Sequence, residues 1–438
     1  MSSKVNRRTF LKGGAAAGAG FFVVNSGILR AGQSPNEKLN IAVIGVGGRG
    51  GSNLNDVRSE NIVALCDVNA NNLAGAAKRF PRAKTYRDWR KCLDQKDIDA
   101  VVCSTTDHTH AFVNVWAMNR GKHVYCEKPL ANSVHEARVV RETYLKNKGK
   151  IATQMGTQIH AEGNPRRVVE LIRDGAIGAV KDCKVWCSRK PAGGSYLPEQ
   201  KPVPKHIDWD LWVGPSPFHP YNKGYLGGCL AWNRFWDFGS GQIGDMGSHM
   251  IDLAYWALDL RFPTTCKAEG TEHNSDTCPQ WLTAEWDHPA NDRRPALKLS
   301  WYDGGKKPGM PSPAFNREKL FKGLLFTGDQ GWLLADYDYR ILMLRGDMTH
   351  YKTPGAKELI ADSPGHHREW IIGCKTGKPT LCNFDYSGAL IEHNLLALAA
   401  YRAGEKLEWD ARRLKATNCP AADEYIRKTY RRGWVLNG

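Results

Sequence analysis

Apolar runs alternate with helix-compatible stretches over the first third of the chain. The apolar runs that predict strands lie at 39–45, 61–67, 100–104 and 122–126. The stretches with helix-like composition lie at 50–57, 72–80 and 111–119. Strands that alternate with helices at this spacing predict a parallel, doubly wound sheet of the α/β class. We expect this domain to occupy residues 37–150.

The pattern changes after about residue 150. Strand-like stretches such as 180–188 and 281–286 follow one another without regular helices, and Trp, Pro and Gly become frequent. The Pro- and Lys-rich stretches 190–206 and 303–322 predict long surface loops. We therefore expect residues 151–438 to form an α+β domain with a largely antiparallel sheet. Its C-terminal helical part is a candidate for packing back on the first domain.

The N-terminal residues differ in character from the rest. The run Asn6-Arg7-Arg8-Thr9-Phe10-Leu11-Lys12 precedes a Gly- and Ala-rich apolar stretch that is too weakly hydrophobic for a transmembrane helix. This arrangement is typical of a twin-arginine export signal, whose translocation machinery moves folded proteins. We expect a signal over 1–32 and a periplasmic or extracytoplasmic location. No Ala-x-Ala cleavage site occurs near 26–33, so retention at the membrane by an uncleaved signal stays open.

Charge and cysteine content narrow the function classes. The chain carries 61 Lys+Arg against 45 Asp+Glu, a formal net charge of +16. The basic residues are spread out, without an arginine-rich helix or a nucleic-acid motif, so the charge favours anionic ligands and not nucleic acid. The 12 cysteines form no Cys-x-x-Cys, and Cys66 and Cys103 lie in apolar runs. This pattern predicts buried free thiols.

A glycine-rich motif, Gly45-Val46-Gly47-Gly48-Arg49-Gly50, follows the first predicted strand and opens the first predicted helix. In that context Gly45 permits a tight turn, Gly47 lets the backbone approach a pyrophosphate, and Gly50 allows close helix packing. Asp67 ends the next strand about twenty residues later, where a carboxylate accepts the ribose hydroxyls. The combination predicts a Rossmann domain that binds NAD. Asp67 repels the 2′-phosphate of NADP, although Arg49 keeps NADP open.

Two further motifs carry candidate catalytic residues. Lys128 in Glu127-Lys128-Pro129 comes just after a predicted strand, at the ligand-binding edge of such a sheet. Asp245 and His249 are four residues apart, and we expect them to share a face of a helix that begins near Asp245. Each residue also has an ordinary structural explanation: a solvated lysine, a helix N-cap and a core histidine.

These motifs occur together in the order and approximate spacing of one family. They are the glycine turn, Thr105-Thr106-Asp107-His108-Thr109-His110, Glu127-Lys128-Pro129 and Asp245-x-x-x-His249. From Leu39 to Trp434 the chain resembles the Gfo/Idh/MocA oxidoreductases, with Thr106 where the family usually has proline.

The resemblance implies roles for the individual residues. Lys128 would hydrogen-bond the reacting hydroxyl, His249 would accept its proton, and Asp245 would orient the substrate or the imidazole. The nicotinamide pocket would be bordered by Thr105, Asp107, His108, Glu127 and Lys128.

Substrate contacts are expected from two regions. Gln154, Gln158 and His160 follow a strand at Ile151, in a region that the family places near the substrate. Aromatic residues, among them Trp232 and Trp236, precede His249, and sugars stack on such rings, although the same rings suit a domain core. The motifs His108-x-His110 and His366-His367 lack the ligand spacing of a known metal site, so we predict no metal.

The resemblance implies NAD-dependent oxidation of a hydroxyl of a sugar, polyol or glycoside, with hydride transfer to a tightly bound nicotinamide. Two redox-neutral variants stay open: a glycosidase or lyase that oxidises transiently, eliminates and re-reduces, and an enzyme that couples oxidation of one substrate to reduction of another. A non-catalytic glycan-binding protein is the alternative outside the enzymes. Family members commonly pair through the open face of the second sheet, so a homo-oligomer, dimer or tetramer, is expected.

Overall fold

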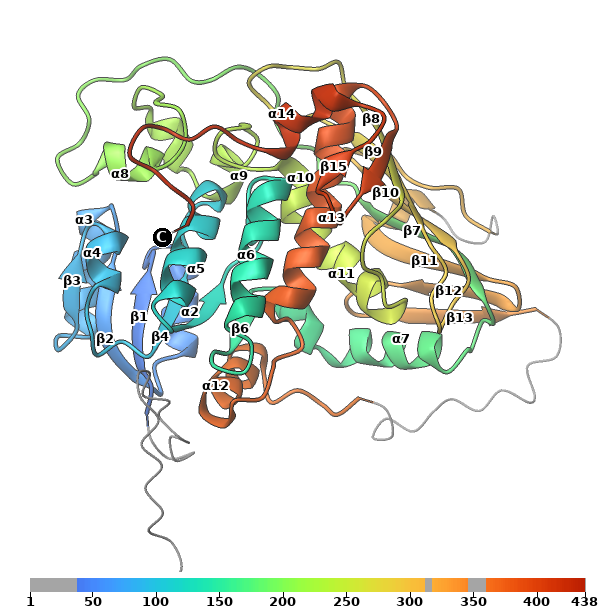
Figure 1. Cartoon of the computed structure of the whole chain (residues 1–438), viewed down its shortest axis with the longest axis horizontal. Helices are drawn as coiled ribbons and strands as arrows, with labels where there is room; N and C mark the ends of the chain where they lie inside the picture. The colour runs from blue at the N-terminus through green and yellow to red at the C-terminus, as the bar shows by residue number, and fades with distance from the viewer. Residues whose placement is uncertain (1–37, 312–316, 346–359, 438) are drawn as a thin grey trace, which may run out of the picture.

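The computed structural model describes residues 38–311, 317–345 and 360–437. The predicted export signal at 1–32 lies outside these residues. Two sheets stand side by side, and helices α6 (Val134–Lys146), α11 (Gly247–Ala257) and α13 (Phe384–Ala403) lie between them (Figure 1).

The first sheet is parallel throughout and has the strand order β3-β2-β1-β4-β5-β6. Its strands are β1 (Asn40–Ile44), β2 (Asn61–Cys66), β3 (Lys84–Tyr86), β4 (Ala100–Cys103), β5 (His123–Cys126) and β6 (Thr153–Met155). Strands β1 and β4 are buried on both faces, which explains why they are continuous apolar runs. The order confirms the predicted doubly wound sheet, and β6 extends it beyond residue 150.

Side-chain caps set where several of the first-domain helices begin. These helices are α2 (Arg49–Asp56), α3 (Ala70–Arg79), α4 (Trp89–Leu93), α5 (Asp107–Asn119) and α6. The side chain of Asn69 accepts a hydrogen bond at the start of α3, and that of Ser133 does so at the start of α6. Helix α5 begins at Asp107, earlier than the predicted start at 111. The prediction missed its first turn because the residues there are polar although buried, and so show no apolar periodicity.

The second sheet has nine strands in the order β13-β12-β11-β7-β10-β9-β8-β14-β15. They are β7 (Val180–Cys187), β8 (Thr265–Gly270), β9 (Leu282–His288), β10 (Leu297–Asp303), β11 (Lys322–Gly328), β12 (Gly331–Ala335), β13 (Arg340–Leu344), β14 (Leu407–Asp410) and β15 (Lys415–Ala416). Only the β7–β10 ladder among the described strands of this sheet is parallel. The predicted largely antiparallel sheet is confirmed.

The remaining elements are short except for α7 and α12. The helices are α7 (Gly163–Arg173), α8 (Trp209–Val213), α9 (Cys229–Trp232), α10 (Gly241–Asp245), α12 (His366–Thr376) and α14 (Asp423–Ile426). The 3₁₀ turns are η1 (Gln158–Ala161), η2 (Lys223–Leu226), η3 (Arg317–Lys319) and η4 (Pro420–Ala422). No helix in the described ranges is both long and apolar enough to cross a bilayer.

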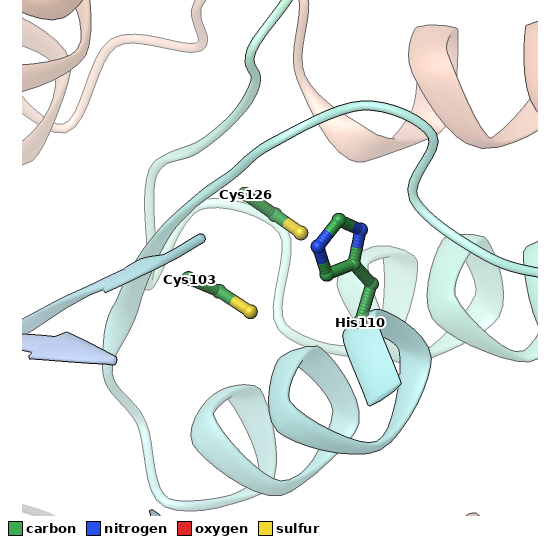
Figure 2. A group of neighbouring side chains, drawn as sticks. All are labelled: Cys103, His110 and Cys126. Carbon is green, nitrogen blue, oxygen red and sulfur yellow. The ribbon is translucent and has the colours of Figure 1, made fainter. Parts of the chain in front are cut away.

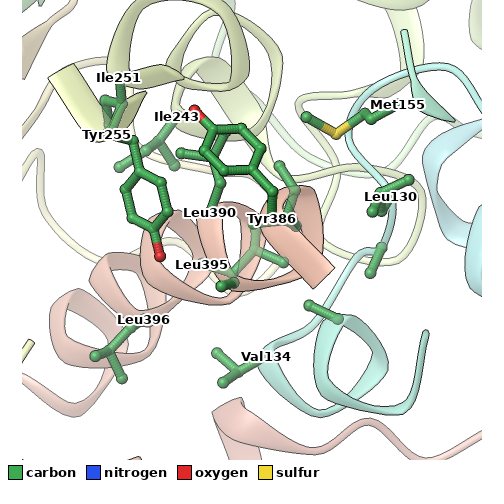
Figure 3. Packing of buried hydrophobic residues seen from close by; sticks show 14 of the residues in the cluster. Leu130, Val134, Met155, Ile243, Ile251, Tyr255, Tyr386, Leu390, Leu395 and Leu396 are labelled. Atoms are coloured by element: carbon green, nitrogen blue, oxygen red, sulfur yellow. The ribbon is translucent and has the colours of Figure 1, made fainter. Parts of the chain in front are cut away.

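Helix α13 joins the two domains through a common core. It is buried over most of its length, and its Tyr386, Leu390 and Leu395 pack near Leu130 and Val134 of the first domain (Figure 3). Arg138 of α6 forms two hydrogen bonds, of 2.8 and 2.7 Å, with the buried Glu392 carboxylate of α13. The two sheets therefore share one packed interior.

Residues from the far end of the chain return to the first domain. The Trp434 ring lies 6.1 Å from that of Trp89 and 5.9 Å from that of Phe112, and the C-terminus lies beside α5 (Figure 1). In α12, Trp370 and Ile371 belong to the same buried cluster as β1. All 12 cysteines are free thiols and only Cys229 is partly exposed, which confirms that prediction.

Candidate active site

The glycine turn joins β1 to α2 and requires residues without side chains. A Cβ on Gly45 would collide with the carbonyl oxygen of Ser104, and one on Gly50 with that of Gly45. Gly48, with a φ of 49°, is the N-cap of α2, and a Cβ there would meet no atom within 4 Å. The positive end of α2 therefore faces open space, which suits a phosphate group.

Asp67 lies beside this turn. Its carboxylate accepts hydrogen bonds from the backbone N–H of Val46, at 2.9 Å, and of Asn69, at 2.8 Å. Burial raises the pKa of Asp67 from its ordinary value. Turn, helix terminus and carboxylate are thus brought together as the NAD prediction requires, and these residues fit a dinucleotide.

Glu127 connects the glycine turn to the end of β5. Its Oε1 accepts hydrogen bonds from Arg49 at 3.0 Å, Asn53 at 2.9 Å and Gln158 at 2.9 Å. Although burial opposes the effect, the charge of Arg49 lowers the pKa of Glu127. Arg49 already has an anionic partner, which weakens the case for it as a ligand of a 2′-phosphate.

Lys128, at the end of β5, shares a carboxylate with a second cation. Its Nζ donates a hydrogen bond to Oδ1 of Asp245, and Nη1 of Arg189 lies 2.9 Å from Oδ2 of the same group. Burial disfavours the charged form of both residues, but the opposite charges and hydrogen bonds around them together have the larger effect. Lys128 lowers the pKa of Asp245, and Asp245 raises the pKa of Lys128. Lysine and aspartate are both ionised at neutral pH.

His249 lies in the first turn of α11. Helix α11 begins at Gly247, close to the predicted start near Asp245, but Asp245 itself is the last residue of α10, so the two residues belong to successive helices. Glycines at 244 and 247 on either side of the junction weaken helical continuity there. Burial, followed by the charge of Lys128, lowers the pKa of His249 to about 4. The imidazole is therefore neutral at physiological pH and able to accept a proton.

The first turn of α5 supplies the other predicted pocket residues. Asp107 is buried, and burial raises its pKa to about 7, with the charges of Lys128 and Asp245 acting on it as well. Thr105 accepts a hydrogen bond of 2.7 Å from Thr109. His108 points elsewhere: its ring nitrogens lie 3.3 Å and 3.0 Å from the carbonyl oxygens of Phe238 and Trp212. It links α5 to α8 and to the segment that precedes α10.

Figure 2 shows a buried group of Cys103, His110 and Cys126, contributed by β4, α5 and β5. Their candidate ligand atoms lie within 4.8 Å of one another. Both nitrogens of His110 face backbone carbonyl oxygens, of Pro129 at 2.6 Å and Thr105 at 3.1 Å. This ring fixes the loops that carry Thr105 and Lys128, so it serves the site without being free to bind a metal.

The candidate substrate residues occupy different environments. Gln154 donates a hydrogen bond of 2.6 Å to the carbonyl of His366, and Gln158 is bonded to Glu127 as described. Trp232 is buried in an aromatic cluster of the second domain. Trp236 is also buried, and its Nε1 donates to the carbonyl of Asn274 at 2.9 Å. Both tryptophans therefore have packing partners typical of a core.

His160 is the candidate substrate residue that borders the same pocket as His249. Arg189, by contrast, is missing from the sequence predictions, although it contacts Asp245. Its only signal is a cation directly after a predicted strand, in a stretch that otherwise predicts a surface loop.

Comparison with known proteins agrees with this geometry. Residues 39–155 match an oxidoreductase family with an NAD-binding Rossmann fold, residues 186–290 match the C-terminal alpha/beta domain of that family, and residues 4–22 match a twin-arginine translocation signal sequence.

Individual relatives are similar over only part of their length. The chain is 32% identical over 145 residues to inositol 2-dehydrogenase of Salmonella paratyphi B, which covers 32% of this chain and 43% of that protein. It is 29% identical over 196 residues to levoglucosan dehydrogenase of Pseudarthrobacter phenanthrenivorans, covering 44% and 42% respectively. The alignments thus span less than half the length of these relatives.

Among solved structures, the fold is similar to the WlbA dehydrogenase of Bordetella pertussis, determined in complex with NADH and UDP-GlcNAcA. The TM-score is 0.61 at 15% identity, and the match covers 85% of this chain and 99% of that one. At this identity the likeness concerns the fold. The two matched family domains show that the chain belongs to the Gfo/Idh/MocA family of oxidoreductases.

Proposed function

We propose that the protein oxidises a hydroxyl group of a sugar or polyol, with NAD as hydride acceptor. The observation that carries this proposal is that a cationic Lys128, just after β5, acts by its charge on a neutral His249 in the first turn of α11. Oxidation of an alcohol needs both, because one group must stabilise the oxygen and another must take its proton. Nicotinamide, when bound, accepts the hydride.

Each residue has a defined task in this proposal. Lys128 donates a hydrogen bond to the reacting oxygen and stabilises the negative charge that develops there. His249 accepts the hydroxyl proton at the nitrogen that faces the substrate. Asp245, fixed by Arg189, holds Lys128 in position. The glycine turn and Asp67 bind the pyrophosphate and ribose of the cofactor.

The substrate class is supported by the relatives. Two of them are named for inositol and for levoglucosan, which supports a polyol or sugar as substrate. NAD is preferred over NADP because Asp67 lies beside the turn and Arg49 is paired with Glu127.

The match to a twin-arginine signal supports export of the folded protein with its cofactor bound. A cofactor retained outside the cytoplasm must be re-oxidised in place, which favours a second candidate: a redox-neutral cycle. In it the same residues oxidise a sugar transiently, and the hydride returns to the product or to a second sugar. Anchoring by an uncleaved signal and assembly into a dimer or tetramer are further parts of this proposal.

The test begins with protein purified from the cell envelope, whose absorbance reveals retained NAD(H). Incubation with a panel of sugars, polyols and glycosides, with and without added NAD, then separates the candidates. Accumulation of reduced cofactor indicates a dehydrogenase, and turnover without added NAD indicates the redox-neutral cycle. Lys128→Met should abolish either activity, while the exposed Lys150→Met should not. Sugar binding without turnover under every condition would contradict the proposal and indicate a binding protein.

A further inference from the structure

Three buried polar atoms belong to residues that line one small pocket beside α11. They are Nε2 of His160, Nδ1 of His249 and the hydroxyl oxygen of Tyr337, and none has a hydrogen-bond partner among the residues the structure describes. Aliphatic side chains from η1, α7, α11 and β11 form the remaining wall. Buried polar atoms normally have partners, so three unpaired ones at a single pocket indicate a bound polar group.

Asp252 determines which nitrogen of the His160 ring carries the proton. Its Oδ2 lies 2.9 Å from Nδ1 of His160, and its Oδ1 accepts a hydrogen bond of 2.8 Å from Tyr386. A carboxylate at Nδ1 holds the proton on that nitrogen, so Nε2 is left as an acceptor that faces the pocket. His160 is 1% exposed and its ring stacks on Trp256 at 3.7 Å, which prevents it from turning away.

Asp252 and His249 belong to the same face of α11, because they are three residues apart. The negative charge of Asp252 acts on His249 together with those of Asp245 and Glu127 and against that of Lys128. Nδ1 of His249 is the buried nitrogen, so Nε2 is the one left for the substrate. A general base usually has its second nitrogen oriented by a hydrogen bond, and this pocket, which His249 lines, offers a place for one.

We propose that one hydroxyl oxygen held in this pocket connects Nδ1 of His249 to Nε2 of His160. Through it, His160 orients the His249 ring and receives a proton from it, and Asp252 stabilises the resulting charge on His160. The oxygen belongs to water or to a second hydroxyl of the substrate. This inference rests on the proposed function, because it takes His249 as the base.

The proton transfers balance without any change in oxidation state. Nε2 of His249 takes the substrate proton while its Nδ1–H is donated to the pocket oxygen. That oxygen passes its own proton to Nε2 of His160, and the resulting imidazolium is stabilised by Asp252. Tyr337 donates the remaining hydrogen bond, so the oxygen accepts two and donates one, as either water or an alcohol can.

The charged groups around the relay are compatible with a cation on His160. Asp252 is in direct contact, and Tyr386 contacts Asp252. His366 is close enough to sense both His160 and His249, and burial lowers its pKa to about 3, so it stays neutral. Arg166 lies over the Trp256 ring and is paired with Glu369.

The test compares Asp252→Asn and His160→Gln with His393→Gln, a matched control. His393 is likewise a buried histidine stacked on a tryptophan, at 4.2 Å from Trp286, but it does not line the pocket. We expect Asp252→Asn and His160→Gln each to lower kcat about tenfold or more at unchanged KM, and to shift the acid limb of the pH profile. The double variant should be no slower than either single one. The control should keep the wild-type kcat and pH profile.

Further experiments distinguish water from a substrate hydroxyl in the pocket, and failure of the relay from failure of the proposed function. A substrate analogue that lacks the neighbouring hydroxyl should lose kcat if that hydroxyl fills the pocket, and keep it if water does. Wild-type kcat in folded Asp252→Asn and His160→Gln, with His249→Asn inactive, would overturn the relay and leave the proposed function intact. A change confined to KM would also overturn it, because that would make His160 a substrate contact. If His249→Asn is fully active, the proposed function itself fails.

Discussion

Arg189 lies 2.9 Å from Oδ2 of Asp245, the carboxylate oxygen that Lys128 does not contact. The aspartate is thereby fixed between the ends of β5 and β7, one strand from each domain. Lys128 is consequently held by a carboxylate that has a partner at each oxygen. The candidate active site thus lies across the domain boundary, and its motifs come from separate stretches of sequence.

Arg189→Met should lower kcat about tenfold, because Asp245 loses one of its two anchors and Lys128 its fixed position. Steady-state kinetics with the wild-type substrate provide the measurement. The neighbouring Lys190→Met, at an exposed side chain, is the control and should behave as wild type. An Arg189→Met enzyme with normal kcat would mean that Lys128 alone suffices to place Asp245.

The rate should fall as the pH drops through about 4. Burial and the charge of Lys128 lower the pKa of His249 to that value, and protonation removes its ability to accept a proton. A profile of kcat/KM against pH measures the limb. Asp107→Asn removes a nearby group whose pKa burial raises to about 7, and the limb near 4 should persist in that variant. A limb near the ordinary histidine pKa would contradict the assignment.

Gly50→Ala should destabilise the protein and abolish NAD retention, because the new Cβ would overlap the carbonyl oxygen of Gly45. Thermal unfolding and cofactor content of the purified protein report the two effects. Gly75→Ala is the matched control: Gly75 lies within α3 with no atom within 4 Å of a built Cβ. That substitution should stabilise the protein by about 0.5–1 kcal/mol. Equal stability of the two variants would refute the steric argument.

Asp303→Asn should change how stability depends on pH. Asp303 is buried, and burial raises its pKa from 3.8 to about 7, so the folded protein binds this proton more tightly than the unfolded chain. Its contribution is present below about pH 4 and is lost as the pH rises towards 7. The free energy of unfolding of the wild type should therefore fall relative to the variant by up to about 4 kcal/mol across that window. Urea titrations at several pH values test this, and a constant difference would be inconsistent with it.

Much of the first domain could be predicted from the sequence because its strands are buried on both faces. A run such as Ala100–Cys103 has to be apolar throughout, and the turn after β1 has to be glycine where a Cβ would strike a carbonyl. These constraints are local, so they are visible in a single sequence. The family and the fold class could be predicted correctly because the motifs that indicate them are subject to such local constraints.

Other features depend on contacts between distant residues. The first turn of α5 could not be predicted because Asp107 and His108 are buried polar residues, and the partners of His108 come from other elements. No proline marks the break between α10 and α11, so one usual sequence signal for the end of a helix is missing there. Arg189 and Asp252 matter through the groups they face, Asp245 and His160, and no local pattern specifies that pairing.

The return of the C-terminal segment to the first domain has a consequence for biosynthesis. Asn119 donates a hydrogen bond of 2.8 Å to the carbonyl of Asn437, 318 residues later, and Trp434 packs against Trp89 and Phe112. A ribosome makes Trp89 and Phe112 long before it makes the residues that cover them. The cofactor domain therefore cannot complete this part of its surface until residues 434–437 have been synthesised and have left the exit tunnel.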